Sequence, residues 1–315
     1  MKVIYDIGRI KKKFPRPVIA IGIFDGVHLG HQKLIRKVIE KAKSLNGTSM
    51  VMTFFPHPAN ILNPKNPVPL LVSLERRIAL IRDLGVQVCL VVPFTRKFSN
   101  LKPQDFIEKY LFGKVAPEKV FVGKNFHFGK NRQGTPNFLK QIGNQYGFET
   151  NVVSFARNHR RTISSTRIRK LILKGQLQTA REFLGRPVSI FGKVSVGKKV
   201  GKTLGFPTAN IHPSGEILPP RGVYLAQVVL NKRIHNGVAN IGIRPSFRER
   251  NKALNVEVYI FNFKKNIYGK EIEVRFLSKV RPERRFSTRE SLAQQIQKDV
   301  ELAKEMFRAH RAYSA

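Results

Sequence analysis

The residues best suited to chemistry in the first half of the chain are the two histidines of Gly22-Ile-Phe-Asp-Gly-Val-His-Leu-Gly-His31. This segment follows the apolar run of residues 18–24 and leads into a stretch of helical periodicity, which predicts a strand–loop–helix turn. Such a turn presents backbone N–H groups and the positive end of a helix dipole to a phosphate. His28 and His31 are three residues apart and share one side of the helix start, where they can hydrogen-bond phosphate oxygens in a transition state.

The rest of this loop also suits a nucleotide phosphate. Glycines let the backbone approach a ligand closely, and the absence of a Lys-Ser/Thr pair excludes a P-loop. A glycine-rich turn with two surface histidines would have the same composition, but the strand–loop–helix context favours phosphate binding. The residues assigned to ATP or phosphate are Gly22, Phe24, Asp25, Gly26 and Gly30.

A second candidate phosphate element is Thr162-Ile-Ser-Ser-Thr-Arg-Ile-Arg169. It places hydroxyl groups at a predicted helix N-cap and two arginines in the first turns, which could hold the terminal phosphates of ATP or a leaving pyrophosphate. An ordinary helix cap remains an alternative. The residues assigned to phosphate here are Ser164, Ser165, Thr166 and Arg169.

Together these two elements resemble the FAD synthetase module of bacteria, a nucleotidyltransferase related to the HxGH cytidylyl- and adenylyltransferases. The similarity extends to Phe54-Phe-Pro-His-Pro58 and to Val122-Gly-Lys-Asn-Phe-His-Phe-Gly129. The resemblance implies adenylylation of FMN by ATP, with His28 and His31 catalytic and Asn125 close to the nucleotide or the flavin. One departure is Phe55, where the family commonly has an acidic residue.

The second half of the chain contains a glycine-rich segment, Gly192-Lys-Val-Ser-Val-Gly-Lys-Lys-Val-Gly-Lys-Thr-Leu-Gly-Phe-Pro-Thr-Ala-Asn210. Its glycines suit a flap that folds over a nucleotide. Thr208 and Asn210 supply neutral oxygen ligands suited to Mg²⁺ shared with ATP phosphates. Glycine-rich β-turns beside a buried polar pair remain an alternative. The flap residues assigned to ATP are Gly192, Gly197, Gly201, Lys202, Gly205 and Pro207.

A single carboxylate in a strand-like stretch, Glu257, could act as general base on a hydroxyl group, although an ordinary outward strand position would look the same. With the flap, Gly222-Val-Tyr224 and residues 236–242, it resembles the riboflavin kinase module. That resemblance implies that Thr208 and Asn210 bind Mg²⁺ and ATP, and that Glu257 deprotonates riboflavin. Lys202 replaces a usual arginine, which keeps the charge but loses bidentate geometry.

The two resemblances cover nearly the whole chain and imply a bacterial bifunctional riboflavin kinase/FAD synthetase. The expected partners are riboflavin, FMN, FAD and ATP, with ATP as co-substrate and Mg²⁺ as the metal. We expect an adenylyltransferase domain in residues 1–184 and a riboflavin kinase domain in residues 185–315. A chain in which one of the two sites has lost activity is a close alternative.

The elements that must position these residues alternate in type through the first half. Apolar strands alternate with amphipathic helices, which predicts a doubly wound α/β domain with ligands at the carboxyl ends of its strands. The predicted strands are 18–24, 50–55, 86–92, 119–122 and 151–155, and the predicted helices are 31–45, 74–84, 103–112 and 135–146.

The elements of the second half are mostly short strands. A helical link, 165–184, leads into alternating strands with frequent turns, which predict a small antiparallel barrel closed by a C-terminal helix, 288–308. The predicted strands of the barrel are 189–196, 223–230, 232–243, 256–263 and 271–276.

Bulk composition adds one unusual feature, a net charge of +38 over 315 residues. The basic residues are spread over both halves, so the charge is expected to attract anionic nucleotides generally and no specific nucleic acid. A basic RNA-binding protein remains the alternative of a different class, although no RRM or KH pattern supports it. The single cysteine, the lack of a long apolar run and the lack of a leader-like N-terminus favour the cytoplasm without membrane attachment.

Overall fold

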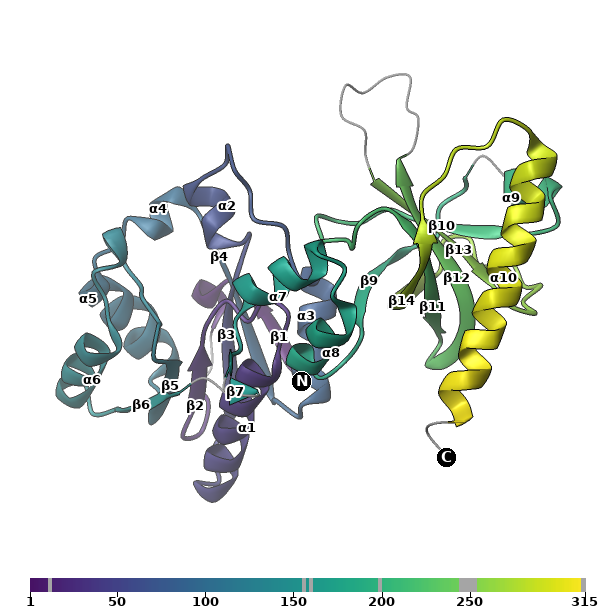
Figure 1. Cartoon of the computed structure of the whole chain (residues 1–315). Coiled ribbons are helices and arrows are strands. Elements are labelled where there is room, and N and C mark those ends of the chain that lie inside the picture. Colours follow the sequence, from purple (N-terminus) through teal and green to yellow (C-terminus); the bar gives the residue numbers. More distant parts are fainter. Residues whose placement is uncertain (11–12, 155–156, 159–160, 198–199, 244–253, 313–315) are drawn as a thin grey trace. The chain divides into compact units, whose positions relative to one another are not determined.

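The computed structural model describes residues 1–10, 13–154, 157–158, 161–197, 200–243 and 254–312. The chain divides into two compact units (Figure 1). Unit 1 comprises Met1–Leu70 and Leu74–Ser165, and unit 2 comprises Leu71–Ser73 and Thr166–Ala315. The predicted domain boundary between residues 184 and 185 stays a prediction, and each unit is described separately below.

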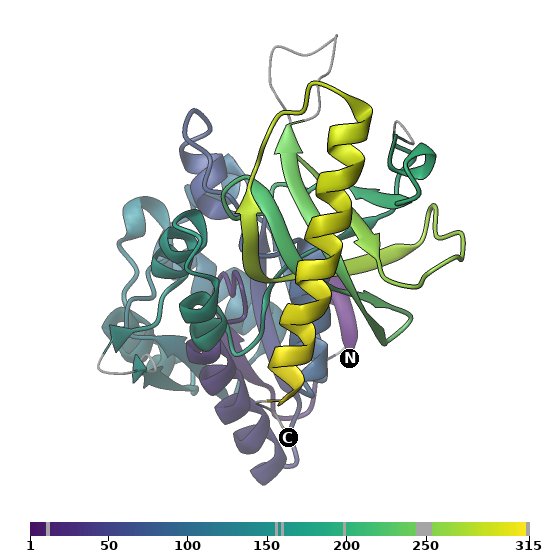
Figure 2. The same cartoon turned by 45° about the vertical axis from the view of Figure 1, so that its right-hand side comes forward.

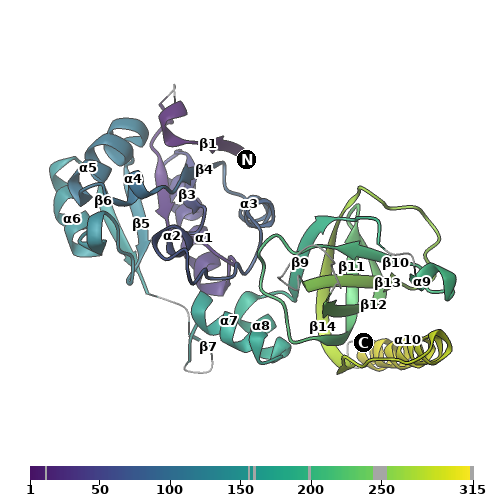
Figure 3. The ribbon, with the colours of Figure 1, turned by 90° about the horizontal axis from the view of Figure 1, so that it is seen from above.

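Unit 1 is built on a six-stranded parallel sheet in the order β1-β4-β3-β2-β5-β6 (Figure 3). The predicted parallel α/β architecture is therefore confirmed. Apolar strands flanked by helices form this arrangement because both faces of each strand must be buried. The strands are β1 (Lys2–Tyr5), β2 (Val18–Ile21), β3 (Ser49–Phe55), β4 (Val88–Pro93), β5 (Lys119–Gly123) and β6 (Glu149–Val153).

Alternate residues of each strand enter two separate cores, one on each face of this sheet. Ile19 and Ile21 of β2 belong to one core, whereas Val18 and Ala20 belong to the other. The second core also holds the apolar faces of α1 and α3. The helices of unit 1 are α1 (Leu29–Ser44), α2 (Pro58–Leu62), α3 (Leu74–Asp83), α4 (Arg96–Ser99), α5 (Pro103–Asp105), the π-helix η2 (Phe106–Val115) and α6 (Pro136–Gln145), with short 3-10 turns η1 (Ile7–Arg9) and η3 (Lys130–Arg132) and a hairpin of β7 (Arg157–Asn158) and β8 (Arg161–Thr162).

The order of the strands creates a switch point beside β2. From β2 the chain moves to β3 on one side, whereas β5 pairs with β2 on the other side. Connections that leave in opposite directions open a crevice at the carboxyl ends of the two strands, where ligands of doubly wound sheets bind. The loop after β2 and the segment after β5 both begin at this edge of the sheet.

Unit 2 contains a six-stranded antiparallel sheet in the order β10-β13-β12-β11-β14-β9. An isolated bridge between Ser195 and Asn210 links the two ends of this order, so the sheet curls as the predicted barrel-like architecture requires. The elements are α7 (Ser165–Leu173), α8 (Leu177–Leu184), β9 (Val188–Lys193), α9 (Val200–Thr203), β10 (Thr208–Ile211), β11 (Gly222–Leu230), β12 (Arg233–Ile243), β13 (Leu254–Ile260), β14 (Glu271–Pro282) and α10 (Arg289–Ala312).

The C-terminal helix α10 lies across the curled sheet (Figure 2). Ala303 and Phe307 pack into a core with Val223 and Leu225 of β11. The Arg281 guanidinium of β14 donates two hydrogen bonds of 2.7 Å to the Asp299 carboxylate of the helix. This bidentate pair anchors the helix next to its apolar contact.

Several local elements differ from expectation, among them two strands and one helix. Strand β1 and strand β10 were not predicted, since each has only four residues and neither has a long apolar run. The helix predicted over residues 103–112 is instead one turn of α-helix followed by a π-helix that ends at Ala116 in the left-handed conformation. Within the described residues, no helix has the length and apolar character that a bilayer crossing requires.

Cys89 provides a test of the packing of unit 1. It is fully buried in β4, and burial raises the pKa of its thiol to about 12. At pH 8 only about one thiol in 10⁴ would then be ionised, and the thiolate is the reactive form. We expect the native protein to resist a thiol-specific reagent that labels the denatured chain stoichiometrically. Rapid labelling at pH 8 without denaturant would contradict this packing; because the chain has one cysteine, the signal is unambiguous.

Candidate active sites

The loop between β2 and α1 turns sharply at three residues with left-handed backbone. Phe24 has φ of 52°, Gly26 has φ of 82° and Val27 has φ of 40°. Gly22 permits this fold, because a Cβ there would lie 3.1 Å from the ring of Phe24. Phe24 and Val27 are both buried, so the side chains of the turn pack into the core of unit 1.

The two histidines of this loop are neighbours at the start of α1. Their rings stack with centroids 3.6 Å apart and an angle of 16° between the planes. His28 is the N-cap residue, and its Nδ1 accepts the backbone N–H of His31 at 3.3 Å. In a neutral His28 ring the proton is therefore on Nε2, which makes that atom a hydrogen-bond donor. Gly30 is buried in the first turn of the same helix.

Two other segments that the sequence singled out begin at the same edge of the parallel sheet, after β5 and after β3. Asn125 is the second residue after β5 and is exposed, and its carbonyl oxygen lies 3.1 Å from Nδ1 of His127. After β3, the buried His57 caps α2 by accepting the backbone N–H of Ala59 at 3.2 Å. The cap gives His57 a structural role, whereas Asn125 is accessible to a ligand.

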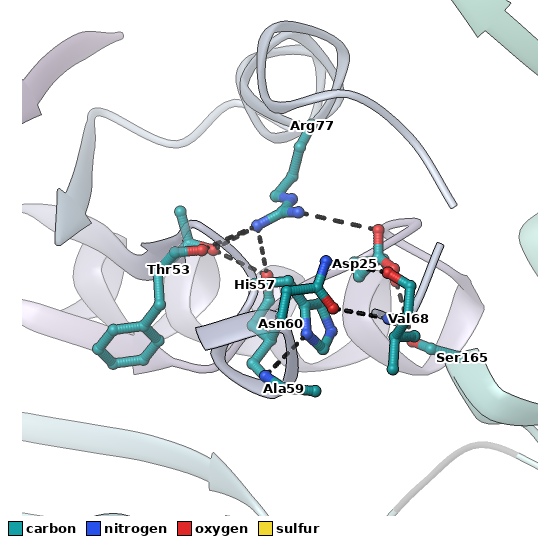
Figure 4. A network of polar contacts seen from close by, with 10 residues as sticks. Asp25, Thr53, His57, Ala59, Asn60, Val68, Arg77 and Ser165 are labelled. Carbon is teal, nitrogen blue, oxygen red and sulfur yellow. Dashed lines mark hydrogen bonds and ion pairs between the residues drawn. The ribbon is translucent and has the colours of Figure 1, made fainter. Parts of the chain in front are cut away.

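The hydroxyl-rich segment contacts the loop through Ser165. Its Oγ donates to the carbonyl oxygen of Asp25 at 3.0 Å (Figure 4). Ser164 lies directly before α7 and is half-buried, while Thr166 and Arg169 continue α7 within unit 2. The assignment of Ser164, Thr166 and Arg169 to phosphate stays a prediction.

Strand register in unit 2 brings the polar residues of the second predicted site together. Asn210 of β10 pairs with Glu257 of β13, which in turn pairs with Asn240 of β12. Residues paired directly across an antiparallel sheet share a face, and so do residues two apart on one strand. Thr208, Asn210 and Glu257 therefore lie on one face of the sheet.

Asn255 connects these residues. Its Nδ2 donates to Oδ1 of Asn210 at 2.9 Å and approaches Oε1 of Glu257 at 3.2 Å. Asn210 and Asn255 are both buried. Oδ1 of Asn255 is buried and has no hydrogen-bond partner among the described residues.

Two glycines of the flap, Gly197 and Gly201, lie close to the same polar side chains. A Cβ at Gly197 would lie 2.3 Å from Nδ2 of Asn210, and one at Gly201 would lie 2.4 Å from the carbonyl oxygen of Phe206 and 3.3 Å from Oγ1 of Thr208. Gly192 packs against Ile211, Gly205 has φ of 84° and Pro207 is exposed. The side chain of Lys202 lies outside the described residues.

Two residues beside these sites were missed from sequence, Arg77 and Asn255. Arg77 is completely buried and contacts the first loop. A signal for it existed, because Arg77 shares the apolar i, i+3, i+4, i+7 face of α3 with Leu74, Ile78 and Ile81. Asn255 had a weaker signal, its period-two spacing from Glu257.

Comparison with known proteins assigns both halves of the chain. The FAD synthetase family model matches residues 10–167, and the riboflavin kinase family model matches residues 184–307. A protein of Buchnera aphidicola subsp. Schizaphis graminum named bifunctional riboflavin kinase/FMN adenylyltransferase is 38% identical over 310 residues, covering 98% of this chain and 99% of the relative. One of the same name from Bacillus subtilis is 38% identical over 301 residues, covering 95% of each chain.

One solved structure is similar to this chain over nearly its whole length. The crystal structure of a protein from Streptococcus pneumoniae, titled a macrolide-efflux protein, superposes with a TM-score of 0.83 at 28% identity, covering 96% of this chain and 99% of that one. Because both family models match and these full-length relatives share more than a third of their residues, the chain belongs to the bifunctional riboflavin kinase/FMN adenylyltransferase family.

Proposed function

We propose that the chain makes FAD from riboflavin in two ATP-dependent steps at two sites. Unit 2 converts riboflavin and ATP to FMN and ADP, and unit 1 converts FMN and a second ATP to FAD and pyrophosphate. The observation that supports the proposal is the pair of stacked histidines at the N-terminus of α1, because a helix N-terminus favours phosphate oxygens. Neither step requires a covalent enzyme intermediate, so catalysis depends on positioning and charge.

In the adenylyl transfer, a phosphate oxygen of FMN attacks the α-phosphorus of ATP. The bond from that phosphorus to the oxygen bridging to the β-phosphate breaks, and pyrophosphate leaves. His28 donates from Nε2 and, with His31, stabilises the negative charge that grows on the α-phosphate oxygens. In this proposal the residues of the loop between β2 and α1 bind ATP. The departing phosphates are held by Ser164, Ser165, Thr166 and Arg169. Asn125 binds the nucleotide or the flavin.

In the phosphorylation, Glu257 accepts the proton of the riboflavin 5′-hydroxyl group. The hydroxyl oxygen bonds to the γ-phosphorus as the bond to the oxygen bridging to the β-phosphate breaks, and ADP leaves. Asn255 supports this role, because its amide holds the Glu257 carboxylate beside Asn210. The flap glycines cover the phosphates through their backbone.

The polar face of unit 2 fits the Mg²⁺ that this chemistry implies. Thr208 and Asn210 offer neutral oxygens, a ligand type that Mg²⁺ accepts, and the buried Oδ1 of Asn255 beside them has no partner among the described residues. Thr208 and Asn210 would hold the ion, which when bound neutralises charge on the ATP phosphates. A cytoplasmic location and the absence of a specific nucleic-acid partner remain predictions from the sequence.

Two substitutions separate the steps. With riboflavin, ATP and Mg²⁺, the wild-type chain should produce FMN first and FAD later, as resolved by chromatography. His28→Ala removes a transition-state donor and should lower the rate of adenylyl transfer by about 10²–10³-fold, so that FMN accumulates. Glu257→Gln removes the base and should lower FMN formation by about 10²–10⁴-fold while added FMN is still converted to FAD.

Each variant is the control for the other, since the unaffected step shows that the chain is folded. Normal FAD production by His28→Ala would exclude the proposed role of the loop. Loss of both activities in either variant would contradict the separation of the sites. Tight RNA binding at physiological salt with no flavin turnover by the wild type would exclude the enzymatic function altogether.

Gly197→Ala tests the flap. The added Cβ would overlap the Asn210 side chain, so the flap or Asn210 must move. A displacement of about 1 Å at a phosphoryl-transfer site costs about 10²-fold in rate, and we expect a loss of that order in FMN formation. Conversion of added FMN to FAD, measured on the same sample, should be unchanged. Wild-type kinetics in both steps would show that the flap does not close on Asn210.

A further inference from the structure

Arg77 occupies an unusual position for a charged residue. It lies on α3 between Leu74 and Ile78, on the face that packs against the sheet, and none of its surface is exposed. A buried guanidinium persists where its charge is paired and its N–H groups are hydrogen-bonded. The neighbours of Arg77 therefore indicate what the residue does.

Those neighbours lie near the end of β3 and in the loop between β2 and α1 (Figure 4). Nη1 of Arg77 donates to the carbonyl oxygens of Ile23 at 3.1 Å and Phe54 at 3.2 Å, and it lies 3.3 Å from Oγ1 of Thr53. Nη2 is 3.8 Å from Oδ1 of Asp25, whose side chain is also buried. One side chain thus ties the end of β3 to the backbone on which the loop begins and to a carboxylate within the loop.

The loop needs such support because of its backbone. Phe24 and Val27 adopt left-handed conformations that L-residues rarely occupy, and these persist only where the surroundings hold them. Arg77 contacts the chain on both sides of Phe24, at the Ile23 carbonyl and at the Asp25 carboxylate. Asp25 is held further through its own carbonyl oxygen by Ser165.

We propose that Arg77 is a positioning residue for adenylyl transfer, an inference that rests on the proposed function of unit 1. Its guanidinium holds Ile23 and Asp25 so that the loop turns at Phe24 and presents His28 and the N-terminus of α1 to ATP. The cation is buried beneath the loop and acts through loop geometry, without touching the reacting atoms.

The test compares variants of the full chain in both steps. Arg77→Lys keeps a positive charge but cannot reach the two carbonyls and the carboxylate together. We expect its kcat for conversion of FMN to FAD to fall by about 10²-fold, with the kinetics of FMN formation unchanged. Arg82→Gln, an exposed residue of the same helix, is the matched control and should leave both steps unchanged.

A double-mutant cycle of Arg77→Lys and Asp25→Asn distinguishes a positioning role from a purely structural one. The kinetics are measured at a temperature where circular dichroism shows that every variant is folded. If Arg77 acts by holding Asp25, the losses in kcat from Arg77→Lys and Asp25→Asn will be clearly less than additive in the double variant. A structural role would lower the melting temperature and leave the kcat of the folded protein unchanged, which would overturn the proposal.

Thr53→Val provides a second variant if Arg77→Lys does not fold. It removes the hydroxyl that donates to the Ile23 carbonyl at 2.8 Å without leaving a buried charge, and about a tenfold loss of adenylyl transfer alone is expected. Wild-type kinetics of adenylyl transfer in Arg77→Lys would overturn the inference while leaving the proposed function intact. If Arg77→Lys does not fold, wild-type kinetics of adenylyl transfer in Thr53→Val would do the same. A wild-type chain that makes no FAD from FMN would overturn both.

Discussion

The left-handed turn at Phe24, Gly26 and Val27 is the constraint on which the first site depends. It reverses the chain within a few residues between the end of β2 and the start of α1, and so it places the helix N-terminus at the carboxyl edge of the sheet. Only one of the three residues is glycine, so the conformation cannot come from local preference alone. Groups from other elements contact the residues beside Phe24: Arg77 of α3 contacts the Ile23 carbonyl and the Asp25 carboxylate, and Ser165 donates to the Asp25 carbonyl.

The second site is held by strand register instead. Asn210 faces Glu257 because β10 and β13 pair antiparallel in one particular register, and the hydrogen bond from Asn255 to Asn210 also joins these two strands. A shift of one residue would move the carboxylate to the opposite face. The first candidate site is thus a loop held by contacts from other elements, whereas the second is a row of side chains on paired strands.

The sequence determines much of this through periodicity. Apolar runs and amphipathic helices were enough to predict both architectures, and the spacing of His28 and His31 predicted their adjacency, since neighbours three apart on a helix meet wherever the helix lies. The contacts of Arg77 and Asn255 could not be predicted in the same way. They depend on which helix covers which strand and on which residue faces which across a sheet, and neither is encoded within a short window. Strand β10 was missed because four residues beside a glycine-rich flap show no period.

The large positive charge is expected to act on the encounter with ligands, before the short-range contacts form. A net charge of +38 raises the local concentration of anionic nucleotides over the whole surface, but a field of that range cannot select one phosphate over another. Selection requires groups fixed at short range, such as the stacked imidazoles of His28 and His31 in unit 1 and the side-chain amides of Asn210 and Asn255 in unit 2. The surface charge therefore favours encounter with anionic nucleotides in general, whereas any discrimination between phosphates must come from polar groups at short range.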